Sequence, residues 1–313
     1  MKLSLVIPCY NEEENVQHFY NEVKRVLFPE SYSVELVFVN DGSRDGTIKE
    51  LKKIYRADRE HVSIISFSRN FGKEAAILAG MKRATGDLVT LIDADLQQRP
   101  EVVKEMVDIL LADDGIDCVA AYQEQRHEGK LRSMLKRMFY RIMKRTSEIE
   151  FVQGASDFRT FRRNMVDTII SLPEYFRFSK GIFSWVGFET QYIPYEVKER
   201  HAGTTKWSFF KLVKYAIEGF ISYTTFPLKL ATILGTVISV GSIIYLMGTI
   251  IEKMIIGIDV PGYPTLVALI SFLGGIQLLI LGIMGEYLSR IYMEGKRRPI
   301  YIEKEVMLSE RES

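Results

Sequence analysis

Two long stretches without a charged residue place the strongest constraint on how this chain can fold. Residues 230–251 and 264–285 each contain 22 residues and no Asp, Glu, Lys or Arg. As a helix, such a stretch extends roughly 33 Å, which is enough to cross a bilayer core of about 30 Å. The alternative is a pair of buried helices in a large soluble domain. Because two such stretches follow each other closely, we expect two membrane-spanning helices.

Basic residues flank these stretches unequally, which predicts an orientation. The segment between the two stretches carries only Lys253, whereas Lys206, Lys211, Lys214 and Lys229 precede the first, and Arg290, Lys296, Arg297, Arg298 and Lys304 follow the second. Loops rich in lysine and arginine stay in the cytoplasm. We therefore expect a multi-pass protein of the cytoplasmic membrane whose two large ends face the cytoplasm.

The first 125 residues alternate between two kinds of segment. Short apolar, β-branched runs predict buried strands at residues 2–9, 34–40, 63–67, 88–93 and 118–122. Between them, apolar residues at helical spacing predict helices at residues 15–27, 47–55, 73–83 and 100–111. A further strand is expected at residues 157–161. This alternation predicts an α/β domain with a mostly parallel sheet.

Four of the predicted strands end in polar clusters. These are Pro8-Cys9-Tyr10-Asn11-Glu12, Asn40-Asp41-Gly42-Ser43, Ser68-Arg69-Asn70 and Asp93-Ala94-Asp95. In open α/β sheets, ligands bind outside the carboxyl ends of the strands. We therefore expect the four clusters to converge on one crevice.

Asp93 and Asp95 are candidate metal ligands. Hard cations such as Mg²⁺ or Mn²⁺ take oxygen ligands, often one or two carboxylates together with substrate phosphates. The alternative is that both residues cap the following loop and helix. Asp41 also has two alternative roles. It can accept hydrogen bonds from a base or ribose, or it can form a tight turn before the next helix.

Combined with Val6-Ile7-Pro8-Cys9-Tyr10-Asn11-Glu12, these clusters resemble family 2 glycosyltransferases with the Rossmann-like GT-A fold. More narrowly, the chain is similar to polyprenyl-phosphate glycosyltransferases related to dolichyl-phosphate mannose synthase, of the bacterial bactoprenol glucosyltransferase type. The motifs that carry this similarity are Asp93-Ala94-Asp95-Leu96-Gln97, Asp157-Phe158-Arg159, Ser184-Trp185-Val186-Gly187-Phe188 and Arg200-His201-Ala202-Gly203-Thr204-Thr205-Lys206-Trp207.

The resemblance implies a metal-dependent hexosyltransferase. Its expected reaction is the inverting transfer of one sugar, glucose or N-acetylglucosamine, from a UDP-sugar to polyprenyl (undecaprenyl) phosphate at the cytoplasmic membrane face. The product would serve cell-envelope glycosylation. Expected partners are the UDP-sugar, the polyprenyl phosphate, the bilayer, a second copy of the chain, a downstream flippase and a lumenal-side glycosyltransferase. A net charge of +1 argues against nucleic acid as a partner.

The resemblance also implies roles for individual residues. Pro8, Tyr10, Glu12 and Asp41 match positions that hold the base and ribose, and Asp93, Asp95 and Gln97 match positions that hold Mg²⁺ or Mn²⁺ on the diphosphate. Arg126, Arg132, Arg200 and Lys206 are similar to positions near the acceptor phosphate or donor diphosphate. Asp157 occupies the position of a base, yet it could equally orient Arg159 or the acceptor.

The expected domains are a GT-A catalytic domain at residues 1–206, amphipathic interfacial helices at 207–225, a two-helix membrane hairpin at 226–290 and a cytoplasmic tail at 291–313. A basic amphipathic helix is expected at 129–145, and disorder is expected after Ile302. The chain lacks the Gln-x-x-Arg-Trp motif of processive synthases, which favours a single transfer. Two other functions stay open: transfer to a diacylglycerol lipid or protein, and a non-catalytic membrane scaffold that binds nucleotides.

Overall fold

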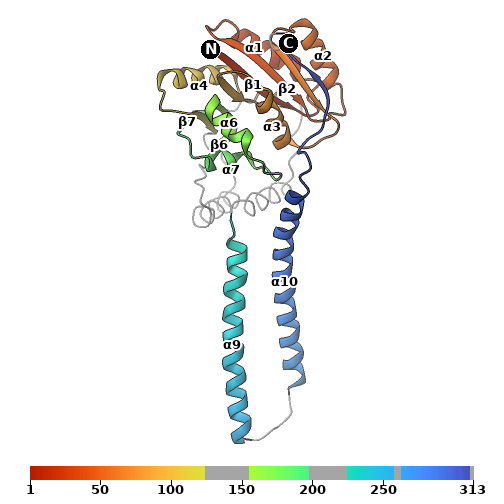
Figure 1. Cartoon of the computed structure of the whole chain (residues 1–313), viewed down its shortest axis with the longest axis vertical. Coiled ribbons are helices and arrows are strands. Elements are labelled where there is room, and N and C mark those ends of the chain that lie inside the picture. Colours follow the sequence, from red (N-terminus) through yellow and green to blue (C-terminus); the bar gives the residue numbers. More distant parts are fainter. Residues whose placement is uncertain (124–154, 197–223, 257–261, 311–313) are drawn as a thin grey trace. The chain divides into compact units, whose positions relative to one another are not determined.

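The computed structural model describes residues 1–123, 155–196, 224–256 and 262–310 (Figure 1). The chain divides into two compact units. The first joins Met1–Ala216 to Arg298–Ser313, and the second is Ile217–Arg297. The second unit is therefore an insertion between two segments of the first.

The first unit is built on a mixed sheet with eight strands in the described ranges, in the order β7-β5-β6-β4-β1-β2-β3-β8 (Figure 1). Strands β1 to β4 are mutually parallel, and β5 is parallel to β7. Strand β6 is antiparallel to β4 and β5, and β8 is antiparallel to β3. The strands are β1 (Lys2–Cys9), β2 (Ser33–Asn40), β3 (Val62–Phe67), β4 (Leu88–Leu91), β5 (Cys118–Gln123), β6 (Ala155–Arg162), β7 (Thr190–Tyr195) and β8 (Glu303–Met307). The predicted α/β fold with a mostly parallel sheet is confirmed.

Helices cover both faces of this sheet because their apolar residues recur at helical spacing. One apolar cluster joins Leu3, Leu5 and Ile7 of β1 to α1, α2 and α4. A second cluster joins β2 and β3 to three alanines of α3, whose small side chains allow close packing on the sheet. The helices are α1 (Val16–Leu27), α2 (Thr47–Ala57), α3 (Lys73–Arg83) and α4 (Pro100–Ala112).

The later part of this unit contains elements that the sequence did not predict. These are α6 (Arg163–Ser171), α7 (Ser179–Trp185) and β7. Helix α6 buries Met165, Val166 and Ile169, a pattern too short to stand out from sequence alone. Strand β4 ends at Leu91, two residues before the predicted end at 93, so Asp93 lies in the loop beyond it.

The segment after residue 298 corrects a prediction, because disorder after Ile302 is wrong. Strand β8 pairs with β3 in a register that sets Val306 opposite Ile65. The ring of Tyr301 stacks on that of Phe67 with 4.9 Å between centroids. Without this strand, β3 would be a sheet edge with unpaired backbone groups. The charged composition that suggested disorder instead supplies ion pairs, of Glu303 with Arg83 at 3.1 Å and of Glu305 with Lys52 at 2.7 Å.

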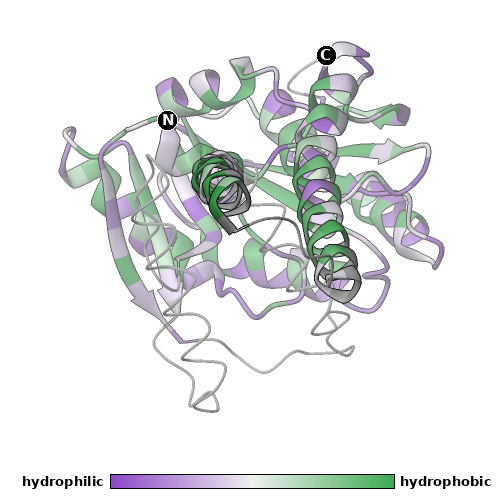
Figure 2. Ribbon diagram, turned by 90° about the horizontal axis from the view of Figure 1, so that it is seen from below, coloured by the Kyte–Doolittle hydropathy of each residue, from purple (hydrophilic) through white to green (hydrophobic). Residues whose placement is uncertain are grey.

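The second unit contains α9 (Phe226–Ile256) and α10 (Tyr263–Gly295), which are apolar over most of their length (Figure 2). Segments Phe226–Tyr245 and Phe272–Gly295 are long and apolar enough to cross a membrane. Only 6% and 0% of these windows are buried, whereas the core helix of a soluble domain is mostly buried. Within this unit the Tyr287 hydroxyl donates to the Thr224 carbonyl at 2.8 Å. The helices predicted at 129–145 and 207–223 lie outside the described residues.

Candidate active site

Hydrogen bonds join the loops that follow β1 and β2 at the carboxyl ends of both strands. The backbone N–H of Asn11 donates to Ser43 Oγ at 3.0 Å, and that of Glu12 donates to Thr47 Oγ1 at 2.8 Å. In return, Asn11 Oδ1 accepts the backbone N–H of Arg44 at 2.9 Å. Glu12, one of the predicted nucleotide-binding residues, therefore lies on a loop that is fixed in place.

Asp41 fixes the loop between β3 and α3 against the end of β2. It is 4% exposed, and its carboxylate accepts the backbone N–H groups of Phe71 at 2.6 Å and Gly72 at 3.0 Å. Burial raises the pKa of Asp41, while these two bonds act to lower it. Gly42 has φ 59°, and a Cβ there would lie 2.3 Å from the backbone carbon of Arg69, so only glycine fits this close approach. Binding of base or ribose by Asp41 stays a prediction.

The Asp93 carboxylate is oriented by a buried amide. The Asp93 backbone N–H donates to Gln98 Oε1 at 2.8 Å, and Gln98 Nε2 donates to Asp93 Oδ2 at 3.1 Å. Gln98 is 7% exposed, so its position is fixed. Asp95 Oδ1 accepts the backbone N–H of Gln97 at 3.1 Å. The amide that contacts Asp93 thus belongs to Gln98, while the predicted role of Gln97 in metal binding stays a prediction.

Lys73, the first residue of α3, contacts the same carboxylate. Its Nζ lies 2.7 Å from Asp93 Oδ1 and 3.5 Å from Asp157 Oδ2. Gly72 precedes it with φ 100°, a conformation that favours glycine and that turns the chain into the helix. Burial acts to lower the pKa of Lys73, but Asp93 and Asp157 raise it above its ordinary value. Lys73 is therefore a permanent cation between two carboxylates.

Asp157 reaches this point because β6 runs antiparallel to β4. The register pairs Leu91, the last residue of β4, with Arg159, and Asp157 lies two residues before Arg159 on β6, at the end where the loop that carries Asp93 begins. Burial acts to raise the pKa of Asp157, but the charges of Lys73, Lys180 and Arg159 lower it overall, so the group is ionised at neutral pH. Its Oδ1 atom is buried and has no hydrogen-bond partner among the described residues. Such an atom is costly unless a ligand contacts it.

Glu74 adds a third acidic group beside Lys73. Its carboxylate accepts the backbone N–H of Ser179 at 2.9 Å and also the Ser179 hydroxyl, which links α3 to the start of α7. Burial and the nearby charge of Asp157 raise the pKa of Glu74 to about 7, against the lowering effect of the two bonds from Ser179. Glu74 therefore titrates near neutral pH, next to a carboxylate that does not.

These residues fit a cation that binds together with a phosphate group. In the described ranges, no group of three or more His, Cys, Asp and Glu side chains could hold a metal by itself. Mg²⁺ sites that act on phosphates commonly use one or two carboxylates and complete their coordination with phosphate and water oxygens. Asp93 and Asp95, with the unpartnered oxygen of Asp157 nearby, supply this kind of donor set.

The remaining predicted site residues fall into two groups, one at the expected edge of the sheet and one outside the described residues. Pro8 belongs to β1 and Tyr10 to the loop after it, at the expected edge of the sheet. Arg126, Arg132, Arg200 and Lys206 lie outside the described residues. Sequence reasoning missed Lys73, Gln98 and Glu74. A signal for Lys73 was present, because it follows the polar cluster Ser68-Arg69-Asn70 at a strand end and begins a predicted helix.

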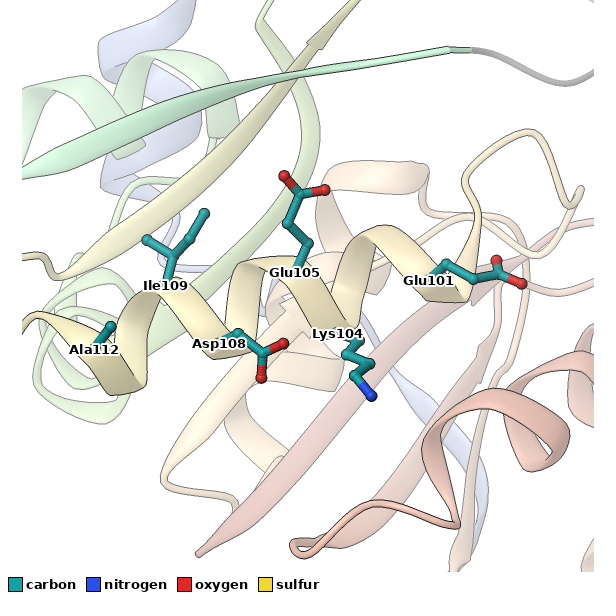
Figure 3. A pocket seen from close by; sticks show the side chains of 6 residues that line it. All are labelled: Glu101, Lys104, Glu105, Asp108, Ile109 and Ala112. Carbon is teal, nitrogen blue, oxygen red and sulfur yellow. The ribbon is translucent and has the colours of Figure 1, made fainter.

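A shallow hollow lies along α4, away from the carboxylates described above. Its volume is about 520 Å³, and its lining comes from this helix alone: Glu101, Lys104, Glu105, Asp108, Ile109 and Ala112 (Figure 3). In Figure 3 the charged side chains point in different directions and do not converge on one position. Lys104 is already paired with Glu30 at 2.5 Å. The candidate active site therefore lies at the strand ends.

Comparisons with known proteins show the family to which the chain belongs. Residues 4–170 match the profile of Glycosyl transferase family 2. An uncharacterised glycosyltransferase of Synechocystis is 42% identical over 96% of this chain and 94% of the relative. A prophage bactoprenol glucosyl transferase homolog of Escherichia coli is 42% identical over 98% of this chain and 99% of the relative. A bactoprenol glucosyl transferase of Shigella phage SfV is 41% identical over 97% and 98%. The chain belongs to glycosyl transferase family 2, and its α/β sheet has the GT-A fold predicted from its motifs.

Proposed function

We propose that this glycosyltransferase moves one glucose from UDP-glucose to the phosphate of a membrane polyprenol, with inversion at the anomeric carbon. The observation that carries this proposal is the similarity to bactoprenol glucosyl transferases, which spans 97–98% of the chain and so includes both apolar helices. Membrane helices give an enzyme access to an acceptor that cannot leave the bilayer. The names of these relatives favour glucose over N-acetylglucosamine, the other sugar that the sequence left open.

On the donor side, we assign Asp93 and Asp95 to a Mg²⁺ or Mn²⁺ ion, with Gln98 orienting Asp93. The bound ion would neutralise the charge that develops on the leaving nucleoside diphosphate. Pro8, Tyr10, Glu12 and Asp41 are assigned to the base and ribose. The fixed loops after β1 and β2 support this assignment, because they form a rigid edge beside the two carboxylates.

On the acceptor side, a phosphate oxygen forms the new bond to the anomeric carbon while the bond to the nucleoside diphosphate breaks. A phosphate is already ionised at neutral pH, so this attack requires no proton removal. Asp157 is held by cations that lower its pKa, which makes it a weak base. We therefore assign Asp157 to orientation of charged groups and not to proton transfer.

The test uses the full-length chain in detergent with undecaprenyl phosphate and, in separate reactions, radiolabelled UDP-glucose, UDP-N-acetylglucosamine and GDP-mannose. We expect label from UDP-glucose to enter the lipid phase, transfer to stop in EDTA, and Mg²⁺ or Mn²⁺ to restore it. Asp95→Ala should abolish transfer in a protein that still folds. Label that appears in diacylglycerol but not in the polyprenyl phosphate would contradict the proposed acceptor, and full activity in EDTA would contradict the metal.

A further inference from the structure

Lys73 forms an ion pair with Asp93, one of the two carboxylates that we assign to the metal ion. Its ammonium contacts both oxygens of Asp93, Oδ1 at 2.7 Å and Oδ2 at 3.0 Å. Gln98 also donates to Oδ2. Together these donors take three of the roughly four acceptor positions of the Asp93 carboxylate, so a divalent cation at Asp93 would compete with them for the same oxygens.

The partner that can leave is Lys73. Gln98 is buried and bonds to the Asp93 backbone as well as to its side chain, so it is held at two points. Lys73 has a flexible four-carbon stem, and 43% of its side chain is exposed. Two positive charges that compete for one carboxylate at this distance repel each other strongly. Arrival of a cation at Asp93 therefore favours movement of the ammonium.

The displaced ammonium has a suitable new partner in the donor itself. As the sugar departs, the diphosphate of the leaving nucleotide gains a third negative charge, which is more than one divalent cation neutralises. Lysine binds phosphate as a point charge, and charge-assisted hydrogen bonds are the strong ones in such sites. Asp157, 3.5 Å from Nζ at its Oδ2 atom, keeps the ammonium at the strand ends while Asp93 is released.

We propose that Lys73 is a mobile cation of the active site, which neutralises Asp93 and Asp157 in the free enzyme and pairs with the donor diphosphate in the complex. This inference rests on the proposed function, because it needs a diphosphate donor. It makes Lys73 a competitor of the metal when no nucleotide is present and a helper of nucleotide binding when the metal is present. Loss of the Lys73 charge should therefore strengthen metal binding in the absence of nucleotide and weaken nucleotide binding in the presence of metal.

The first measurement is the affinity of the full-length chain for Mn²⁺ without nucleotide, from the electron paramagnetic resonance signal of free Mn²⁺. Lys73→Gln removes the charge and should bind Mn²⁺ about tenfold more tightly than the wild type. Lys73→Met serves as a second neutral variant if the first does not fold. Lys73→Arg keeps the charge and should not bind more tightly. Lys82→Gln, which removes an exposed charge from the other end of α3, is the matched control and should equal the wild type.

The second measurement is the affinity for UDP at saturating Mn²⁺, in which Lys73→Gln should bind about tenfold more weakly. Mn²⁺ and UDP affinities equal to those of the wild type would overturn the role of Lys73 while leaving the proposed function intact. Failure of the wild type to bind UDP at saturating Mn²⁺ would overturn the proposed function as well. Tighter Mn²⁺ binding in Lys73→Gln and in Lys82→Gln alike would also contradict the inference, because the effect would then come from net charge.

Discussion

At the scale of single residues, the candidate site depends on the balance between two carboxylates and one ammonium group. Asp93 follows the end of β4, Asp157 lies on the neighbouring strand β6, and two carboxylates that contact one ammonium group repel each other. Lys73 removes that repulsion from a third element, α3. One buried oxygen of Asp157 has no hydrogen-bond partner among the described residues. The site is therefore preorganised for a bound group.

The role of Asp157 leads to a prediction about its neutral variant. Asp157→Asn keeps the shape of the side chain but weakens the attraction to Lys73. We expect glucose transfer to slow by about tenfold, because a lost general base typically costs 10²–10⁴-fold and no proton has to be removed from a phosphate acceptor. Steady-state rates with undecaprenyl phosphate measure the effect. Loss of more than about a thousandfold in a folded protein would identify Asp157 as a base instead.

Glu74 predicts a pH dependence of stability. Its pKa is about 7 in the folded chain and has a reference value of 4.5, so the folded state binds more protons between these values. The contribution of Glu74 to the free energy of unfolding is therefore fully present below pH 4.5 and is lost as the pH rises through 7, by about 3 kcal/mol at most. Glu74→Gln should remove this fall. Thermal unfolding at pH 5 and pH 8 measures it, with the exposed Glu14→Gln as control; an equal shift in wild type and Glu74→Gln would contradict the prediction.

Sequence reasoning succeeded for residues whose place depends on one strand and failed where it depends on two. Asp93 and Asp41 could be predicted, because each follows a recognisable buried run. Lys73 and Gln98 were missed, although Lys73 follows a polar cluster at a strand end, because their contacts with Asp93 depend on the path of the loop after β4. The resemblance to a family placed Asp157, which local pattern alone would have left as an ordinary strand residue.

At the scale of elements, β8 connects the chain beyond α10 to the active-site face of the sheet. The Ser68 backbone N–H donates to the Ile302 carbonyl at 3.0 Å, next to the loop that leads to Lys73. Tyr55 donates to the Leu308 carbonyl at 2.8 Å, and the Ser309 backbone N–H donates to Ser63 Oγ at 3.0 Å. The strand thus supports β3 along its length and also supports the loop that follows it.

The first unit carries the candidate active site and is called the catalytic unit below. Removal of β8 should destabilise this unit, although the deletion leaves α9 and α10 in the chain. Deletion of residues 299–313 exposes the β3 edge and the apolar side chains of Ile65 and Phe67, because it removes Tyr301 and Val306, which pack against their cluster. We expect a lower unfolding temperature and loss of glucose transfer, since burial of apolar surface contributes about 25 cal/mol per Å². Differential scanning fluorimetry in detergent measures stability. Deletion of residues 311–313 alone is the control, and equal unfolding temperatures for the two deletions would show that β8 contributes little.

Predictability of the elements followed the length of their patterns. The parallel strands and α1 to α4 have long or repeated apolar patterns and were predicted, whereas β7, α6 and α7 are short and were not. Strand β8 was missed for a different reason. Its alternation of Glu and Lys looks like a solvated tail, and only the distant edge of β3 makes it a strand. No local rule contains that information.

At the scale of the whole molecule, the second unit, which contains the apolar helices α9 and α10, is inserted in the sequence between two segments of the catalytic unit. The chain leaves the first unit, passes through α9 and α10, and returns to complete the sheet with β8. If α9 and α10 both cross a bilayer, the segments before and after them must lie on the same side, because both belong to one folded unit. The distribution of basic residues independently predicts that this side is the cytoplasm.

This topology can be tested with single cysteines, because Cys9 and Cys118 are buried and give little background. We expect a membrane-impermeant maleimide to label Gly262→Cys, at the exposed position directly before α10, in intact spheroplasts. Asp114→Cys replaces a side chain that is 99% exposed on the catalytic unit, and it should react only after the membrane is opened. The reverse pattern would place the catalytic unit outside. Equal labelling of both cysteines in intact spheroplasts would mean that the two helices do not cross the membrane, and the accessible acceptor would then have to be sought on the bilayer surface.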